Sequence, residues 1–245
     1  MIVLHHDAAV ADTVKLRIAL AETGTAYHAR HVDTAGFAHW ADAHRRIAPQ
    51  GQVPVLVVAG EPLADPALAL QYIAEAAGSL APPAACDWYA VQSLNARIDA
   101  LLGPAVALLG WQATRSVEAR ADYRRRLAEV PGRERRGGWS AVLEDAEAGD
   151  DHLAAARERV VEAVDELEAR LDPRHDGTEW LVGDAFSIAD INAFALLRGV
   201  PSLLPDAISA TRTPRLAAWF ARVAARPAVA LALGRDTPPA YPPPG

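Results

Sequence analysis

The sequence of 245 residues has few of the residues that build redox and metal centres. Its one cysteine, Cys86, excludes an intramolecular disulfide, a Cys-x-x-Cys redox pair and a zinc site made of cysteines. The eight histidines lack metal-ligand spacing, and the adjacent His5 and His6 point to opposite faces of a predicted strand. The sequence has no glycine-rich phosphate loop after a strand and no Gly-x-Ser-x-Gly motif. We therefore expect no metal.

Basic residues and long apolar runs are also scarce. Lys and Arg number 24 against 31 Asp and Glu, so the formal net charge is −7, which argues against a nucleic-acid partner. No apolar run approaches the roughly 20 residues that span a bilayer, and no basic segment precedes an apolar core at the N-terminus. We expect no membrane partner, no signal peptide and a cytoplasmic location. A hydrophobic content of 51% with 22% charged residues indicates a folded globular chain.

Residues 1–78 alternate short apolar runs with segments of helical periodicity. The order of these segments, βαβαββα, predicts an α/β domain. Glycines and prolines mark the turns between the segments. We expect strands at 2–6, 27–32 and 55–58, a short return strand after the turn at 60–63, and helices at 13–22, 37–47 and 65–77.

The rest of the chain has a helical pattern. Residues 79–86 contain adjacent prolines and predict a linker to a second, all-helical domain at 87–234. The Pro-rich end, 235–245, predicts an extended or disordered tail. Ser187 and Asp190 have the spacing of a helix capping box. We expect helices at 87–112 with a kink at Gly103-Pro104, at 152–171, from Ser187 and from Thr213, and an exposed, partly irregular connection at 117–138.

Four separated motifs resemble those of the glutathione transferase superfamily. They are Gly51-Gln52-Val53-Pro54-Val55-Leu56 before the third strand, residues 15–24 as the first helix, Ser187 to Ile191 as a capping box, and residues 213–228 as a C-terminal helix. The resemblance implies an N-terminal thioredoxin-like domain followed by an all-helical domain. Gly110-Trp111, Val130-Pro131 and residues 180–183 look most like the bacterial β-etherase branch, whose members cleave aryl ethers by attack of glutathione.

The turn Gln52-Val53-Pro54 is the first thiol-binding element that the resemblance implies. In the family the proline is cis, whereas only about 5–6% of X–Pro bonds in folded proteins are. The backbone groups of the residue before it, here Val53, then pair with the cysteinyl part of glutathione as one strand pairs with another. An ordinary trans proline at a strand start is the other interpretation.

Asp65-Pro66 departs from the family pattern of Glu or Gln followed by Ser. In the family that helix end and the serine hydroxyl hold the γ-glutamyl carboxylate of glutathione. Asp65 keeps an acidic side chain for the ligand's ammonium group, or it only caps the helix. Pro66 supplies neither a hydroxyl nor an N–H, so we expect glutathione to bind weakly, although another thiol remains an alternative.

The turn before the first helix holds neither Tyr nor Cys, and Thr13 is its only hydroxyl. In the β-etherase pattern Thr13 falls where a serine stands, so the resemblance implies that it stabilises the thiolate. Asp12 falls where an asparagine stands, and its carboxylate would raise the pKa of a nearby thiol. Either residue is equally well interpreted as a helix cap.

The resemblance implies an enzyme that uses glutathione or another low-molecular-weight thiol against an apolar electrophile. The reaction is conjugation, ether cleavage, dehalogenation or isomerisation, all of which need the same thiolate. Trp111 and Arg115 are candidates for the acceptor pocket, although a core tryptophan and a solvated arginine are equally compatible with the pattern. A protein that keeps this fold for ligand binding or structure without catalysis is the alternative. Members of the family usually form homodimers, so the resemblance also implies a homodimer.

Overall fold

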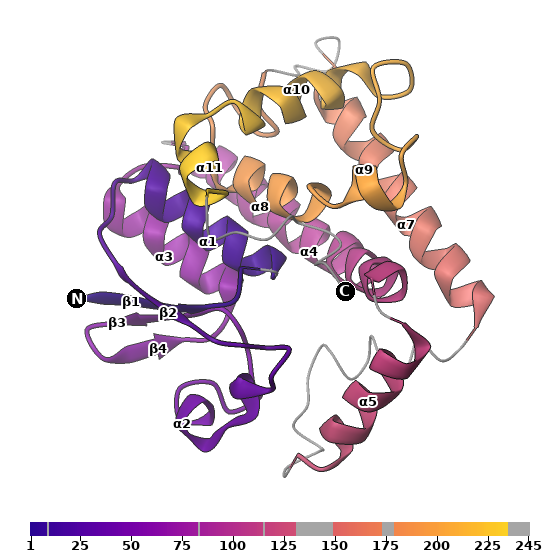
Figure 1. Cartoon of the computed structure of the whole chain (residues 1–245). Helices are drawn as coiled ribbons and strands as arrows, with labels where there is room; N and C mark the ends of the chain where they lie inside the picture. Colours follow the sequence, from indigo (N-terminus) through magenta and orange to yellow (C-terminus); the bar gives the residue numbers. More distant parts are fainter. Residues whose placement is uncertain (9, 83, 115, 131–148, 173–178, 235–245) are drawn as a thin grey trace.

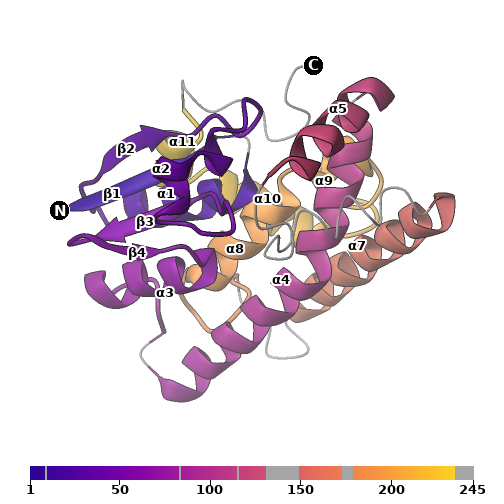
Figure 2. The same cartoon turned by 90° about the horizontal axis from the view of Figure 1, so that it is seen from below.

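Four strands form one mixed sheet in the computed structural model, which describes residues 1–8, 10–82, 84–114, 116–130, 149–172 and 179–234 (Figures 1 and 2). In the sheet β1 pairs with β2 in parallel, and β3 is antiparallel to both β1 and β4. The strand order is β2-β1-β3-β4, the thioredoxin-like arrangement that the sequence predicts. The strands are β1 (Ile2–His6), β2 (His28–His31), β3 (Val55–Val58) and β4 (Glu61–Leu63).

Two long helices cover one face of the sheet and a short one covers the other (Figure 1). Helices α1 (Ala11–Glu22) and α3 (Pro66–Ala77) lie side by side on the first face. The helix predicted at 37–47 is wrong as a single element: a 3-10 turn, η1 (Ala38–Trp40), and α2 (Asp42–Arg45) replace it. Between them Ala41 has extended backbone, with φ −65° and ψ 146°, so it ends η1 and begins α2.

The second domain is helical throughout its described residues, as predicted. The long α4 begins two residues earlier than expected, at Ala85, and contains Pro104. The irregular connection predicted from residue 117 is wrong for its first part, which is helix α5. Ser116 caps α5 by accepting a hydrogen bond from the Ala119 N–H, and Arg and Ala are good helix formers. The helices are α4 (Ala85–Thr114), α5 (Val117–Ala128), α7 (Asp150–Arg170), α8 (Ile188–Leu197), α9 (Val200–Leu203), α10 (Pro214–Ala224) and α11 (Pro227–Ala232).

Helix α1 joins the two domains. It packs on α3 of its own domain and on α8 and α11 of the helical domain. All ten residues of α8 are buried, so this helix forms the centre of the second core. Among the described helices none is long and apolar enough to cross a membrane. Arg115 and the Pro-rich tail at 235–245 lie outside the described residues.

The predicted capping box at the start of α8 is confirmed. The Ser187 side chain accepts a hydrogen bond from Ala189 N–H, and the Asp190 carboxylate accepts one from Ser187 N–H at 3.0 Å. Asp190 also accepts from the Leu181 N–H at 3.0 Å and from the Trp219 indole N–H at 2.8 Å. One fully buried carboxylate therefore ties α8 to α10 and to the segment before α8.

Burial raises the pKa of Asp190 to about 6, against the opposing effect of its N–H donors. A carboxyl whose pKa is higher in the folded state stabilises the fold below its unfolded pKa, and this stabilisation is lost as the pH rises through about 6. Relative to Asp190→Asn, which does not titrate, wild type should lose about 2 kcal/mol of unfolding free energy between pH 4 and 7. Urea unfolding across this range measures it. A difference that stays constant or grows with pH would contradict the assignment.

Candidate thiol-binding site

The last residues of β1 and the first residues of β3, the two central strands, lie together at one end of the sheet. His5 pairs with Val55 in the antiparallel register, so the turn before β3 lies beside the loop that leads into α1. The Val53–Pro54 peptide bond is cis, as predicted. Among the described residues, no hydrogen bond uses the N–H or the C=O of Val53. Both backbone groups are therefore open to a ligand that pairs as a strand would.

A buried histidine that sequence reasoning missed holds this turn. His44 is 7% exposed, and its Nε2 lies 2.8 Å from the backbone oxygen of Gln52, so this nitrogen carries the hydrogen and donates. The ring also packs edge-on against His5, with 6.1 Å between centroids. The Gln52 side chain instead bonds to Gln50 in the same loop. Gln52 thus contributes to the site through its backbone.

The N-terminus of α1 has no side-chain cap. Its N-cap residue is Val10, which has no polar side chain, and the Thr13 N–H bonds to the Val10 carbonyl. Within the described residues the N–H groups of Ala11 and Asp12 have no acceptor. The Thr13 hydroxyl is fully buried and also lacks a partner there. Unused donors and a helix N-terminus together favour a bound anion.

Asp12 does not cap α1, although capping was one interpretation of its position. Its carboxylate lies 2.7 Å from Lys15 Nζ, one turn along the helix. Lys15 is buried, and its Nζ also donates to Asp99 of α4 at 3.2 Å. Burial alone would lower the pKa of Lys15, but the two carboxylates outweigh it and raise this pKa. Lys15 therefore stays charged between two acids from different domains.

The N-terminus of α3 has its donors occupied. Asp65 Oδ1 accepts from the N–H groups of Ala67 and Leu68 at 2.8 and 3.1 Å, which confirms the capping interpretation. Pro66 stands at the first helical position and has no N–H. The other Asp65 oxygen takes no hydrogen bond within the described residues. This end of the site therefore offers a negative charge and no free backbone donor from the first three residues of α3.

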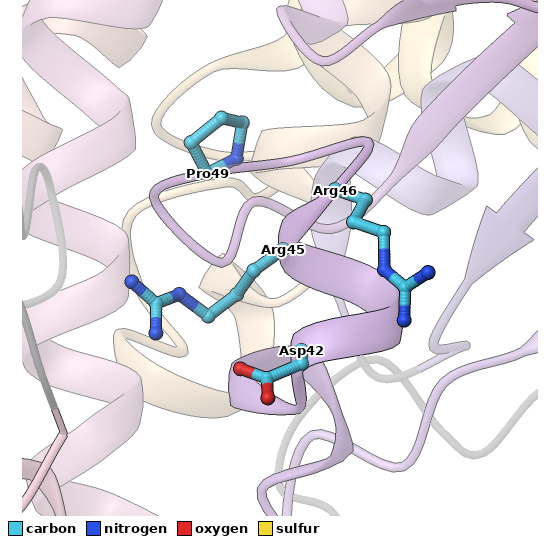
Figure 3. A pocket seen from close by; sticks show the side chains of 4 residues that line it. All are labelled: Asp42, Arg45, Arg46 and Pro49. Carbon is cyan, nitrogen blue, oxygen red and sulfur yellow. The ribbon is translucent and has the colours of Figure 1, made fainter.

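A pocket of about 390 Å³ adjoins α2 and is lined by Asp42, Arg45, Arg46 and Pro49 (Figure 3). The two arginines leave the helix in opposite directions in this view. Arg45 Nε is buried and has no hydrogen-bond partner among the described residues. The same holds for the indole N–H of Trp40. This segment therefore holds two buried donors without partners in the described part of the chain.

Trp111 lies in a second, smaller core that bridges the domains. It is 5% exposed, and its ring contacts Tyr123 of α5, with 5.0 Å between centroids. Tyr123 packs on Phe37 of the first domain at 4.6 Å. Arg126 lies 4.0 Å above the Phe37 ring and donates to the backbone oxygens at positions 35 and 36. Sequence reasoning missed the contact between Phe37 and Arg126, because it joins residues about ninety positions apart.

His39 is a further buried group that sequence reasoning did not select. It is 5% exposed and lies between the rings of Phe37 and Trp40. Burial, with the nearby charge of His44, lowers the pKa of His39 to about 4. The ring is therefore neutral near pH 7. The described residues contain no group of three His, Cys, Asp or Glu side chains placed to hold a metal.

Two family models match this chain: the glutathione S-transferase N-terminal domain over residues 9–75 and the C-terminal domain over residues 135–227. The chain belongs to the glutathione S-transferase superfamily. One superfamily relative, protein LigF from Sphingobium sp. (strain NBRC 103272 / SYK-6), is 25% identical over 238 residues, which cover 89% of this chain and 88% of LigF.

Solved glutathione transferase structures share the fold. Beta-etherase LigF from Sphingobium sp. strain SYK-6 matches with a TM-score of 0.80 at 24% identity, over 95% of this chain and 98% of that one. The glutathione transferase URE2P8 from Phanerochaete chrysosporium, solved with oxidized glutathione, matches with a TM-score of 0.75 at 19% identity, over 94% and 92%. The two-domain architecture of this chain is therefore that of the superfamily.

The His44 hydrogen bond can be tested by a matched pair of variants. His44→Leu fills similar space without a donor and leaves the Gln52 carbonyl unpaired, which costs about 1–3 kcal/mol of unfolding free energy. His44→Gln keeps an N–H donor and should recover part of this loss. Urea unfolding of the two variants measures the difference. A His44→Leu protein as stable as His44→Gln would show that the hydrogen bond does not hold the turn.

Proposed function

We propose that this protein is a thiol-dependent transferase that activates glutathione or a related low-molecular-weight thiol at the N-terminus of α1. The observation that carries the proposal is the uncapped end of α1 next to the unpaired backbone groups of Val53. Free N–H groups and the helix dipole lower the pKa of a thiol placed there from its usual value of about 8.5. The thiol is then a thiolate, and therefore a nucleophile, near neutral pH.

Two further groups support this placement. The cis turn of Val53 and Pro54, held through the Gln52 carbonyl, offers one donor and one acceptor to the peptide-like part of the thiol. The buried hydroxyl of Thr13 has no hydrogen-bond partner among the described residues. A thiolate bound beside it would accept a hydrogen bond from this hydroxyl. We assign Thr13 to the stabilisation of the thiolate.

Different groups of the protein bind the two ends of the thiol compound. Asp65 keeps a free oxygen for the ligand's ammonium group, but neither Pro66 nor the first backbone donors of α3 can hold the γ-glutamyl carboxylate. At the other end Arg45 and Arg46 line the pocket beside α2, where a guanidinium offers a positive charge to a carboxylate. This pattern supports a thiol with a carboxylate near α2 and weak recognition at α3.

The second substrate is an apolar electrophile, held mainly by the helical domain. The aromatic core around Trp111 supports this, because it forms the contact of α4 and α5 with the first domain. Arg115 keeps its place as a candidate acceptor residue. Conjugation, ether cleavage, dehalogenation and isomerisation all start from the same thiolate, and similarity to LigF, a beta-etherase, favours ether cleavage.

A homodimer is part of the proposal. Leu68 of α3 is 57% exposed and Tyr89 of α4 is 73% exposed, so both leave apolar surface in contact with solvent. An isologous contact between two copies would cover such residues on both.

A non-catalytic, ligand-binding or structural protein with this fold is the second candidate function. The capped N-terminus of α3 and the proline at position 66 favour it, because they remove donors that a carboxylate of glutathione would use.

Pro66→Ser tests the thiol that is bound. Restoring a hydroxyl and an N–H should lower the dissociation constant of glutathione about tenfold or more, because a hydrogen bond to a charged group contributes about 1.5–3 kcal/mol. Pro66→Ala restores the N–H alone and serves as the control in the same calorimetric titrations. Low-micromolar binding to wild type would show that other donors replace those of residue 66. Absence of saturable binding of glutathione and of other thiols to every variant would favour the non-catalytic function.

Thr13→Val tests the thiolate donor. Valine keeps the volume of the buried threonine, so it removes the hydroxyl alone. Turnover should fall about tenfold or more, and the pH midpoint of the rate should rise, whereas Thr13→Ser should stay near wild type. The pH–rate profiles of the three proteins measure both effects. If Thr13→Val leaves the profile unchanged, the backbone alone stabilises the thiolate.

A further inference from the structure

Lys15 is the only lysine of the chain, and it occupies an unusual place. Its side chain is 3% exposed, although a lysine is rarely buried so fully unless it is paired. Its partners are Asp12 at 2.7 Å and Asp99 at 3.2 Å, whose side chains are 37% and 34% exposed. One buried cation thus lies between two half-exposed carboxylates.

The pairing of Asp12 with Lys15 affects the charge at the N-terminus of α1, because Asp12 lies in the first turn of this helix. Asp12 is the second residue of α1, and its own N–H is one of the two unused donors at the helix N-terminus. An uncompensated carboxylate there would raise the pKa of a thiol at the same place. Residues three apart on a helix are neighbours on one face, so pairing with Lys15 draws the Asp12 carboxylate along the helix, away from its open end.

We propose that Lys15 is a positioning residue for the thiolate: by drawing Asp12 aside and neutralising it, Lys15 keeps the N-terminus of α1 open and favourable to a negative sulfur. Asp99 holds Lys15 in place from α4, so the charge at the thiol site depends on the docking of the helical domain. The inference rests on the proposed function, because it assumes that a thiol binds at this helix end.

Three other acidic groups near α1 have partners of their own. Asp7 is engaged by the N–H and hydroxyl of Thr34, Asp65 caps α3, and Glu22 pairs with Arg226 at the far end of α1. The charged groups on α1 and on the helices that contact it are Asp12, Lys15, Arg17 and Glu22 of α1, Glu75 of α3, Asp87, Arg97 and Asp99 of α4, Asp190 of α8, and Arg226 before α11.

An introduced thiol measures the charge at this site without any bound ligand. Val10→Cys places a cysteine at the N-cap of α1, and Cys86→Ser removes the natural cysteine, so the protein carries one thiol. The pH dependence of its alkylation by iodoacetamide gives the pKa of the introduced thiol. Adding Lys15→Met should raise this pKa by about one unit, because the Asp12 carboxylate loses its counter-charge.

Two further variants separate charge from structure. Adding Asp12→Asn to Lys15→Met should return the thiol pKa to the value found with Lys15 intact. Arg226→Met breaks a second ion pair, between Glu22 at the far end of α1 and the helical domain, and should leave the thiol pKa unchanged. Melting curves check that each protein is folded.

Two outcomes would overturn the inference. One is a thiol pKa that Lys15→Met does not change. The other is a rise that Asp12→Asn does not reverse, which would mean that loss of domain docking, not charge, moves the pKa. The proposed function is tested independently, by calorimetric titration of wild type and Pro66→Ser with glutathione.

Discussion

The fixed position of α1 between the two domains is the constraint on which the rest of the molecule depends. Near its start Lys15 pairs with Asp99 of α4, and at its end Glu22 pairs with Arg226, with N···O distances of 3.2 and 2.6 Å. Arg226 also stacks on Phe186 at 3.9 Å, so the second contact is part of the helical core. Between these points α1 packs on α3, α8 and α11. The candidate site at its N-terminus is therefore built on a rigid element.

The helices of this protein differ in how their N-termini are satisfied. Since α7 and α10 also lack side-chain caps, the site at α1 is marked by its open N-terminus together with its place beside the cis turn of Val53 and Pro54. Asp65, Ser116 and Ser187 cap α3, α5 and α8 with their side chains. Helix α1 has a valine at the same position and two N–H groups without acceptors in the described part of the chain. Its one acidic neighbour, Asp12, is turned to Lys15. The unused N–H groups of α1 are therefore available for an anion that binds beside Val53.

Local sequence patterns predicted the fold well. The strand Val55–Val58 and the capping box of Ser187 and Asp190 depend on a few neighbouring residues, and both are confirmed. The cis bond before Pro54, which the family resemblance implied, is confirmed as well. The helix predicted at 37–47 failed because its apolar spacing is helical while the backbone at Ala41 is extended. The α5 helix was missed because a charged run was interpreted as irregular surface rather than as a helix capped by Ser116.

Long-range contacts decide the parts of the site that sequence could not give. Asp12 argued against a thiolate. Its neutralisation depends on a buried Lys15 side chain, which Asp99 of α4 holds in place. Likewise His44 was not selected from the sequence, because its hydrogen bond to Gln52 needs the folded turn. The roles of Thr13, Val53 and Asp65 toward a thiol stay predictions.

The central claim is that a thiol binds with its sulfur at the N-terminus of α1 and its backbone against Val53. Amide NMR spectra of isotope-labelled protein, recorded during a titration with glutathione, test it most directly. The account predicts that the N–H signals of Ala11, Asp12 and Val53 shift together, with one saturation curve. Saturable shifts confined to other parts of the chain, with these three signals unmoved, would contradict it.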